Sequence, residues 1–190
     1  MMTTIVEQYN KEVDALPEIH HQGGGGNARN ASGLVYENLI KRTCDRLELD
    51  AKKNDYVKTE EVGGYSLKNL QVDWHVYKNG KMTKAIESKT YLDACYLKRA
   101  ILDFIELDQS PDVPDNVEYA IFAGQNACGD APFAYYPAFF KKITGKDVKI
   151  FFVNPQRKRS SKRAIYIEEY RNDFNLDNVV YNSFIQWLQE

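Results

Sequence analysis

Alternating hydrophobic and polar residues between positions 70 and 92 predict two β-strands joined by a tight turn. The turn falls at 78–81, because Asn-Gly between two alternating runs is the strongest short-range signal of a hairpin. Side chains of a strand point alternately to its two faces. Asp73 on the first strand, and Glu87 and Lys89 on the second, are therefore expected to converge on one side of a sheet.

The rest of the chain mixes helical and β-rich patterns. Apolar residues at helical spacing predict helices over 1–16, 32–47, 92–107, 135–143 and 179–188. Strands are expected over 55–62, 65–77, 117–123, 148–153 and 164–170. Pro17 closes the first helix in this interpretation, and Ser32 is the expected N-cap of the second. The third helix has either Arg99 or Ala100 in its buried stripe. This order of elements predicts an α/β fold.

Four consecutive glycines at 23–26 are expected to interrupt regular structure, because glycine loses more conformational freedom on folding than any other residue. The segment 20–33 is therefore predicted to be a flexible or substrate-ordered loop. One interpretation is a plain linker. The other is a loop that closes over a polyanion, with Arg29 and backbone N–H groups meeting phosphate. It is not a P-loop, because no Gly-Lys-Ser/Thr follows.

Length and composition limit the classes of protein that this sequence fits. A length of 190 residues without an internal repeat predicts one domain, with an N-terminal helix and Gly-rich loop (1–31), a core (32–153), and a basic loop with a closing helix (154–190). The three cysteines contain no CxxC pair, which favours a reducing cytoplasm over a zinc site or a disulfide framework. The sequence has no bilayer-length apolar run and no signal-peptide pattern, so we expect a soluble cytoplasmic protein without a membrane partner.

Net charge at pH 7 is −2, so a nucleic-acid partner would need a local basic patch. Such a patch is present at 157–163, where five of seven residues are basic. A charge run is often only a solvated face, but this one follows a predicted strand in a loop with proline and serine. We favour the phosphate-binding interpretation of this stretch.

Two acids and an amine on one face of a hairpin are suited to holding a hard divalent cation with a polarised water beside it. The competing interpretation is a cross-strand surface pair of Glu87 and Lys89 without catalytic role. Glu37 borders the buried stripe of its helix. It could lie on the surface, pair with Lys41 one turn later, or reach over the hairpin and complete a metal shell.

The series helix with Glu37, strand with Asp73, strand with Glu87-Ser88-Lys89, then helix, strand, helix, strand resembles the PD-(D/E)xK nuclease superfamily, which includes the type II restriction endonucleases. Glu87 follows Asp73 by fourteen positions across the hairpin, as the family pattern allows. Val72 stands where the family name has proline, a position outside the chemistry. The resemblance covers roughly residues 32–153 by the order of elements. It implies a restriction-endonuclease-like core, a central mixed β-sheet flanked by helices.

The resemblance also implies roles for these residues. Asp73 and Glu87 would bind Mg²⁺, with the carbonyl of Ser88 and, directly or through water, Glu37 as further ligands. Lys89 would orient and activate the attacking water. The implied partner is double-stranded DNA, cut by a homodimer at a short palindromic site. Base or phosphate contacts are expected from three stretches, at Asn27, Arg29 and Asn30, at Gln125 and Asn126, and at Gln156, Arg157, Lys158, Arg159, Lys162 and Arg163.

Two alternatives stay open at this point. The chain could be another nuclease of the same superfamily: a repair nicking enzyme, a junction resolvase or a transposon end-cleaving subunit. It could also be a non-catalytic nucleic-acid-binding α/β protein. No Ser-His-Asp order, G-x-S-x-G elbow or dinucleotide fingerprint supports a different enzyme class. The three histidines form neither an HNH-type nor a zinc arrangement, and His75 on a strand is typical of a structural residue.

Overall fold

A computed structural model describes residues 4–66, 70–154 and 174–190 of the chain. Its helices are α1 (Ile5–Asp14), α2 (Leu16–Arg46), α3 (Ala94–Asp108), α4 (Asp130–Thr144) and α5 (Asn178–Gln189). Its strands are β1 (Asp50–Lys53), β2 (Tyr56–Val57), β3 (Leu70–Gln71), β4 (Trp74–Lys78), β5 (Lys81–Leu92), β6 (Glu118–Asn126) and β7 (Val148–Phe152). The chain is thus an α/β protein, as the sequence predicted.

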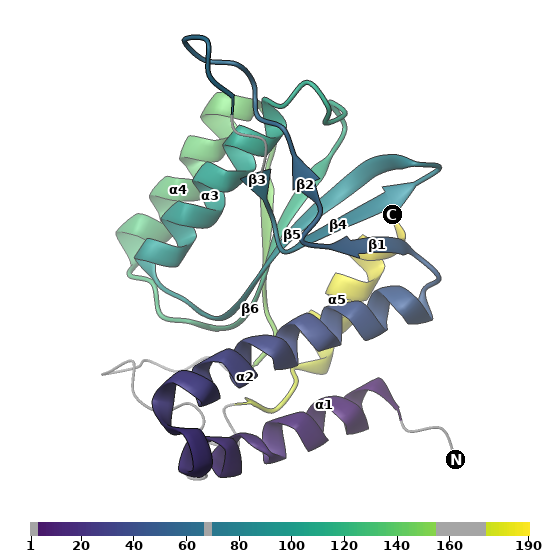
Figure 1. The fold of residues 1–190 in the computed structure, drawn as a ribbon, viewed down its shortest axis with the longest axis vertical. Helices are drawn as coiled ribbons and strands as arrows, with labels where there is room; N and C mark the ends of the chain where they lie inside the picture. The colour runs from purple at the N-terminus through teal and green to yellow at the C-terminus, as the bar shows by residue number, and fades with distance from the viewer. Residues whose placement is uncertain (1–3, 67–69, 155–173) are drawn as a thin grey trace.

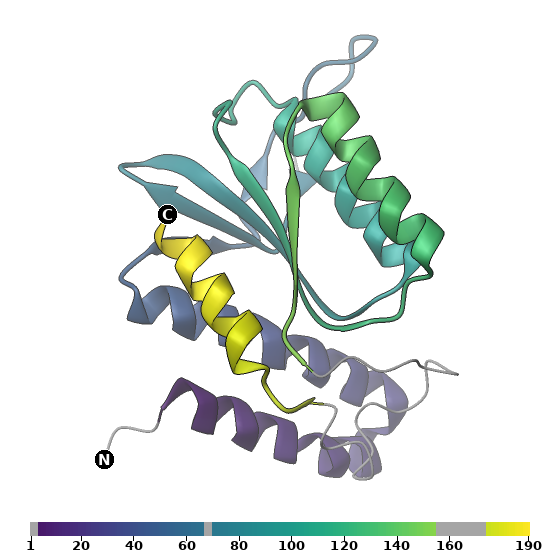
Figure 2. The same ribbon diagram turned by 180° about the vertical axis from the view of Figure 1, so that it is seen from behind.

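The central feature is a five-stranded mixed sheet in the order β1-β4-β5-β6-β7 (Figure 1). The pairs β1–β4 and β4–β5 are antiparallel, whereas β5–β6 and β6–β7 are parallel. Helices α3 and α4 cover one face, and α2 and α5 cover the other, with α1 outside α2 (Figure 2). The predicted central mixed sheet flanked by helices is therefore confirmed.

The hairpin forms where the sequence placed it. Lys78 pairs with Lys81, and the two residues between them, Asn79 and Gly80, have positive φ angles of 54° and 75°. A two-residue turn with both central residues at positive φ matches the right-handed twist of the flanking strands. The alternation of faces is also confirmed. Ala85 on β5 packs among side chains under α3, and its neighbour Ile86 packs under α2.

The strands before the hairpin differ from the prediction. The expected strand 55–62 is reduced to β2 and the expected strand 65–77 to β3 and β4, while β1 forms where no strand was expected. Asn54 adopts a positive φ of 54° and ends β1, so that the chain turns before β2. The polar stretch that follows is largely exposed and projects from the molecule as an arm (Figure 1), because it has few apolar side chains to bury. Asp73 lies in a bend directly before β4, and not within a strand.

The expected loop at 20–33 is wrong, because α2 continues through the four glycines. Each glycine costs a helix about 1 kcal/mol relative to alanine, which local reasoning counts against a helix. Packing on both sides offsets this cost: Leu16 at the start of α2 and Tyr36 beyond the glycines are buried in the same core. Pro17 lies in the first turn of α2, where its fixed φ suits the helix. Ser32 is a buried residue inside the helix and not an N-cap.

The remaining elements lie close to their predicted positions. α4 tolerates Pro137, and α5 carries the buried Trp187. β6 continues to Asn126, beyond the predicted end of this strand at 123. The predicted strand at 164–170 lies outside the described residues. None of the described helices has the length and apolarity needed to cross a bilayer.

Candidate functional site

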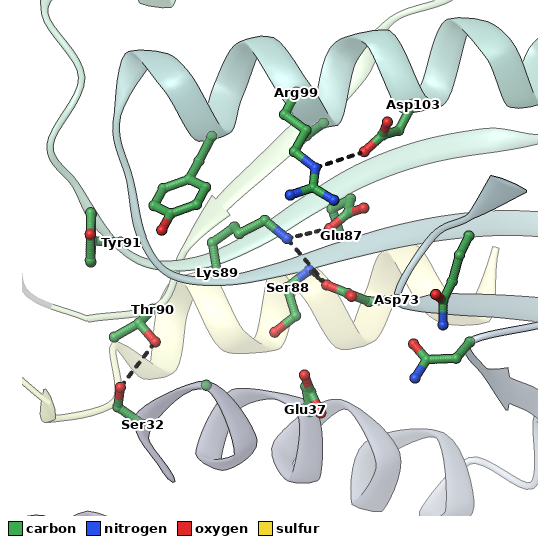
Figure 3. Close-up of a pocket in the computed structure, with 15 residues that line it drawn as sticks. Ser32, Glu37, Asp73, Glu87, Ser88, Lys89, Thr90, Tyr91, Arg99 and Asp103 are labelled. Atoms are coloured by element: carbon green, nitrogen blue, oxygen red, sulfur yellow. Dashed lines mark hydrogen bonds and ion pairs between the residues drawn. The ribbon is translucent and has the colours of Figure 1, made fainter. Parts of the chain in front are cut away.

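A cleft of about 740 Å³ lies where β5 passes between α2 and α3 (Figure 3). The second half of β5, from Glu87 to Tyr91, forms its floor. The bend at Asp73 and the turn at Asn54 close one end. Its two walls come from helices, with Ser32, Gly33 and Glu37 on the α2 side and Tyr96, Arg99, Ala100 and Asp103 on the α3 side.

The three residues that the hairpin pattern singled out meet on this floor. The Lys89 ammonium lies 3.4 Å from Asp73 Oδ2 and forms a shorter ion pair with Glu87 Oε2. Asp73 Oδ2 also accepts a hydrogen bond of 2.8 Å from the backbone N–H of Ser88. That bond fixes the bend before β4 against β5, so Asp73 reaches the same face as Glu87 and Lys89. The predicted convergence is confirmed.

Burial and nearby charges shift the pKa values of Glu87 and Lys89. Only 4% of Glu87 is exposed, and its burial, together with the nearby Asp73 carboxylate, raises the pKa of Glu87 against the opposing effect of Lys89. Burial alone would lower the pKa of Lys89, but the Glu87 and Asp73 carboxylates outweigh it and raise that pKa. The amine therefore stays an ammonium in the cleft. Because Glu87 and Lys89 are mostly buried, a solvated surface pair is the wrong interpretation of them.

The cleft as a whole carries excess negative charge. Its lining includes four carboxyl groups, Glu37, Asp73, Glu87 and Asp103, against the two cations Lys89 and Arg99, a formal charge of −2 when all four acids are ionised. Such a site attracts a divalent cation, and it repels a phosphate group unless a cation accompanies it.

Glu37 faces the floor from the α2 wall (Figure 3). Its carboxylate forms an ion pair of 2.5 Å with Lys53 at the end of β1. Lys41, the partner that helical spacing suggested, pairs instead with Asp45 at 2.6 Å. Glu37 therefore shares the cleft with Asp73 and Glu87. Even so, no three His, Cys, Asp or Glu side chains within the described parts of the chain lie close enough together to hold a metal ion by themselves.

The residues expected to contact DNA lie in three stretches of the chain. Asn27 and Asn30 are exposed, but they lie on α2 and not on a loop, and the side chain of Arg29 lies outside the described residues. Gln125 is buried within β6, and Asn126 Oδ1 accepts a hydrogen bond of 2.8 Å from the backbone N–H of Cys128. These two do not form a base-reading loop, because β6 continues through them. The residues expected in the basic stretch, Gln156, Arg157, Lys158, Arg159, Lys162 and Arg163, also lie outside the described residues.

Sequence reasoning missed the contribution of α3 to the cleft. Arg99 and Asp103 are four residues apart on this helix and form an ion pair, with 3.7 Å between Arg99 Nε and Asp103 Oδ2. Ala100, and not Arg99, occupies the buried stripe. One feature of the sequence could have indicated this wall: Arg99 and Asp103 are oppositely charged and four residues apart, directly after the Glu-x-Lys strand.

No protein-family model matches this chain, and a search of curated proteins found no significant match.

Proposed function

We propose that this protein is a Mg²⁺-dependent, site-specific endonuclease that hydrolyses phosphodiester bonds in double-stranded DNA, with a core of the restriction-endonuclease kind. The observation that carries the proposal is the Lys89 ammonium beside the carboxylates of Asp73 and Glu87 on the floor of an open cleft. The order of elements around it supports the same conclusion. β5 of the antiparallel hairpin bears Glu87 and Lys89, and Asp73 lies directly before β4, its first strand. A helix then leads to a parallel strand.

The donor set fits Mg²⁺. This ion binds through one or two carboxylates, keeps several waters and takes substrate phosphate oxygens, so it does not need a cluster of three acids. Asp73 and Glu87 would hold it, with the Ser88 carbonyl beside them and Glu37 acting through water from the α2 wall. With all four acids ionised, the formal charge of −2 on the lining is balanced by one such ion. When bound, Mg²⁺ lowers the pKa of water and neutralises negative charge on the scissile phosphate.

Lys89 then has a defined chemical task. Its ammonium donates hydrogen bonds to the attacking water, favours the hydroxide form, and offsets the charge that grows on the phosphate oxygens in the transition state. The attacking water releases one proton to solvent, and its oxygen forms a bond to phosphorus while the bond from phosphorus to one deoxyribose oxygen breaks. That oxygen takes a proton from water and leaves as an alcohol. Glu87 and Asp73 keep Lys89 charged throughout.

The active species in this proposal is a homodimer. Cutting both strands of a duplex with one cleft per subunit requires two subunits. The two-fold symmetry of a dimer also matches the symmetry of a palindromic site. Cleavage of one strand, or of branched DNA alone, would instead favour a repair or resolvase role for the same cleft.

The test is incubation of the purified protein with plasmid DNA, with Mg²⁺ or with EDTA, beside the variants Lys89→Ala and Lys98→Ala. Lys98 is an exposed lysine on α3 that does not line the cleft, which makes it a matched control. Discrete fragments that require both Mg²⁺ and Lys89, but not Lys98, support the proposal. A smear of products would refute site specificity. A gel shift without cleavage in any divalent metal would favour the non-catalytic binding protein.

A further inference from the structure

The α3 wall presents a cation to the cleft that the proposed chemistry does not use. The Arg99 side chain is 77% exposed, and its guanidinium points from α3 toward the floor that holds Glu87 and Lys89 (Figure 3). An exposed arginine of this kind is ordinary on a protein surface. Here it lies over a floor that must receive an anion.

Asp103 forms an ion pair with this guanidinium, with 3.7 Å between Asp103 Oδ2 and Arg99 Nε. Figure 3 shows the two terminal nitrogens of Arg99 on the side facing the floor. These nitrogens form the planar fork that matches two oxygens of a phosphate. Asp103 interacts electrostatically with the charged residues of the cleft. Burial raises the pKa of Asp103, the charges of Arg99 and Lys89 lower it, and the Asp73 carboxylate raises it further.

The two walls of the cleft differ in charge. Among the described lining residues, the α2 wall contributes Ser32, Gly33 and the acid Glu37, and no base. The α3 wall contributes the base Arg99 and the acid Asp103, and Lys89 lies on the floor between the walls. A polyanionic strand is therefore repelled from the α2 wall, whereas the α3 wall offers it a base, Arg99.

We propose that Arg99 binds a backbone phosphate and seats the scissile DNA strand against the α3 wall, and that Asp103 is a positioning residue that aims the Arg99 guanidinium. This inference rests on the proposed nuclease function and adds an orientation of the strand within the cleft. Lys89 acts at the reacting phosphate, and Arg99 holds the backbone at the rim.

The experiment compares Arg99→Ala, Arg99→Lys and Asp103→Asn with Lys98→Ala, the adjacent exposed lysine that does not line the cleft. Cleavage of a duplex containing the recognition site gives kcat and KM. Binding is measured in the Lys89→Ala background at several salt concentrations, so that no cleavage intervenes. Each protein is first checked for an unchanged urea midpoint, which is expected because Arg99 is largely exposed.

Arg99→Ala is expected to lower kcat/KM by about 10- to 100-fold, the range for a charge-assisted hydrogen bond, and to reduce the slope of log K against log salt by about one. Arg99→Lys is expected to restore the slope but not the full rate, because lysine keeps the charge and lacks the fork. Asp103→Asn is expected to lower the rate and leave the slope unchanged, because the charge of Arg99 remains.

Failure of this inference and failure of the nuclease proposal are distinguishable. If the unmodified protein cleaves DNA but Arg99→Ala behaves like Lys98→Ala in rate and salt slope, the role of Arg99 is wrong and the nuclease proposal stands. If the unmodified protein neither cleaves nor binds DNA, both are wrong.

Discussion

Gly124→Ala tests how tightly the wall of the cleft is built. Gly124 lies on β6, and a Cβ atom there would come within 3.0 Å of the Thr90 carbonyl oxygen, Tyr36 Oη and Asn154 Oδ1, the last at 2.8 Å. Ordinary van der Waals contact begins at 3.4 Å, so even the Asn154 atom must move by roughly 0.6 Å. Tyr36 donates a hydrogen bond of 2.5 Å to Asn154, and both residues are buried. The added methyl group therefore forces β5 and β6 apart or breaks this bond.

The expected loss of stability follows from the overpacking between β5 and β6 and from the loss of the Tyr36–Asn154 hydrogen bond. Overpacking a well-filled core costs about 1–3 kcal/mol, and losing the Tyr36–Asn154 hydrogen bond costs about 0.5–1.5 kcal/mol more. We expect Gly124→Ala to lower the free energy of unfolding by about 1.5–4.5 kcal/mol. Cleavage is expected to fall as well, because Tyr36 precedes Glu37 on α2 and Thr90 follows Lys89 on β5.

The assay is urea unfolding followed by tryptophan fluorescence. Gly33→Ala is the matched control, because Gly33 lies in α2 with nothing within 4 Å of its Cβ position. The same chemical change there is expected to stabilise the protein by about 0.5–1 kcal/mol. In a Tyr36→Phe background the penalty of Gly124→Ala should shrink, since one of the crowded oxygens is gone. A Gly124→Ala protein as stable as the unmodified one would refute the reasoning.

Three further predictions concern buried titratable groups. His75 is fully buried, neither ring nitrogen has a hydrogen-bond partner among the described residues, and burial lowers its pKa from 6.5 to about 4. Its contribution to stability is therefore present above pH 6.5 and lost as the pH falls toward 4, by about 2–3 kcal/mol at 1.36 kcal/mol per pKa unit. Urea midpoints at pH 7 and about pH 4.5 should show a smaller loss for His75→Phe, and an equal loss would contradict this prediction. Glu87→Gln should raise the urea midpoint at pH 8 while abolishing cleavage, because the raised pKa of Glu87 means that its ionised form destabilises the fold; a lower midpoint would show that the Lys89 pair outweighs burial. Thiol labelling should modify the exposed Cys95 quickly and Cys44 only after unfolding, because burial raises the pKa of Cys44 to about 12. Fast labelling of Cys44 in the folded protein would show that α2 opens.

Local patterns were enough to locate the centre of the cleft. The Asn79-Gly80 turn can form from its own two residues, and strand alternation then places Glu87 and Lys89 on one face. Asp93 is the N-cap of α3, accepting hydrogen bonds of 2.9 Å from the N–H groups of Cys95 and Tyr96, so the helix after β5 also follows from local chemistry. These features depend on residues close together in the chain, and a sequence read alone contains them. The chemistry assigned to the three residues stays a prediction.

Other features exist only because distant segments pack together. α2 continues through its glycines because buried side chains on both sides hold it in one core. Gln125 is buried on β6 beside Tyr91 of β5, although the local pattern predicted that this strand ends at 123. Arg99 faces the cleft because α3 packs over β5 at this turn of the helix. The sequence by itself determined the hairpin turn, the start of α3 and which residues of β5 share a face, since these follow from neighbours along the chain. Only the tertiary structure decided which side chains line the cleft and which are buried, since burial depends on long-range packing.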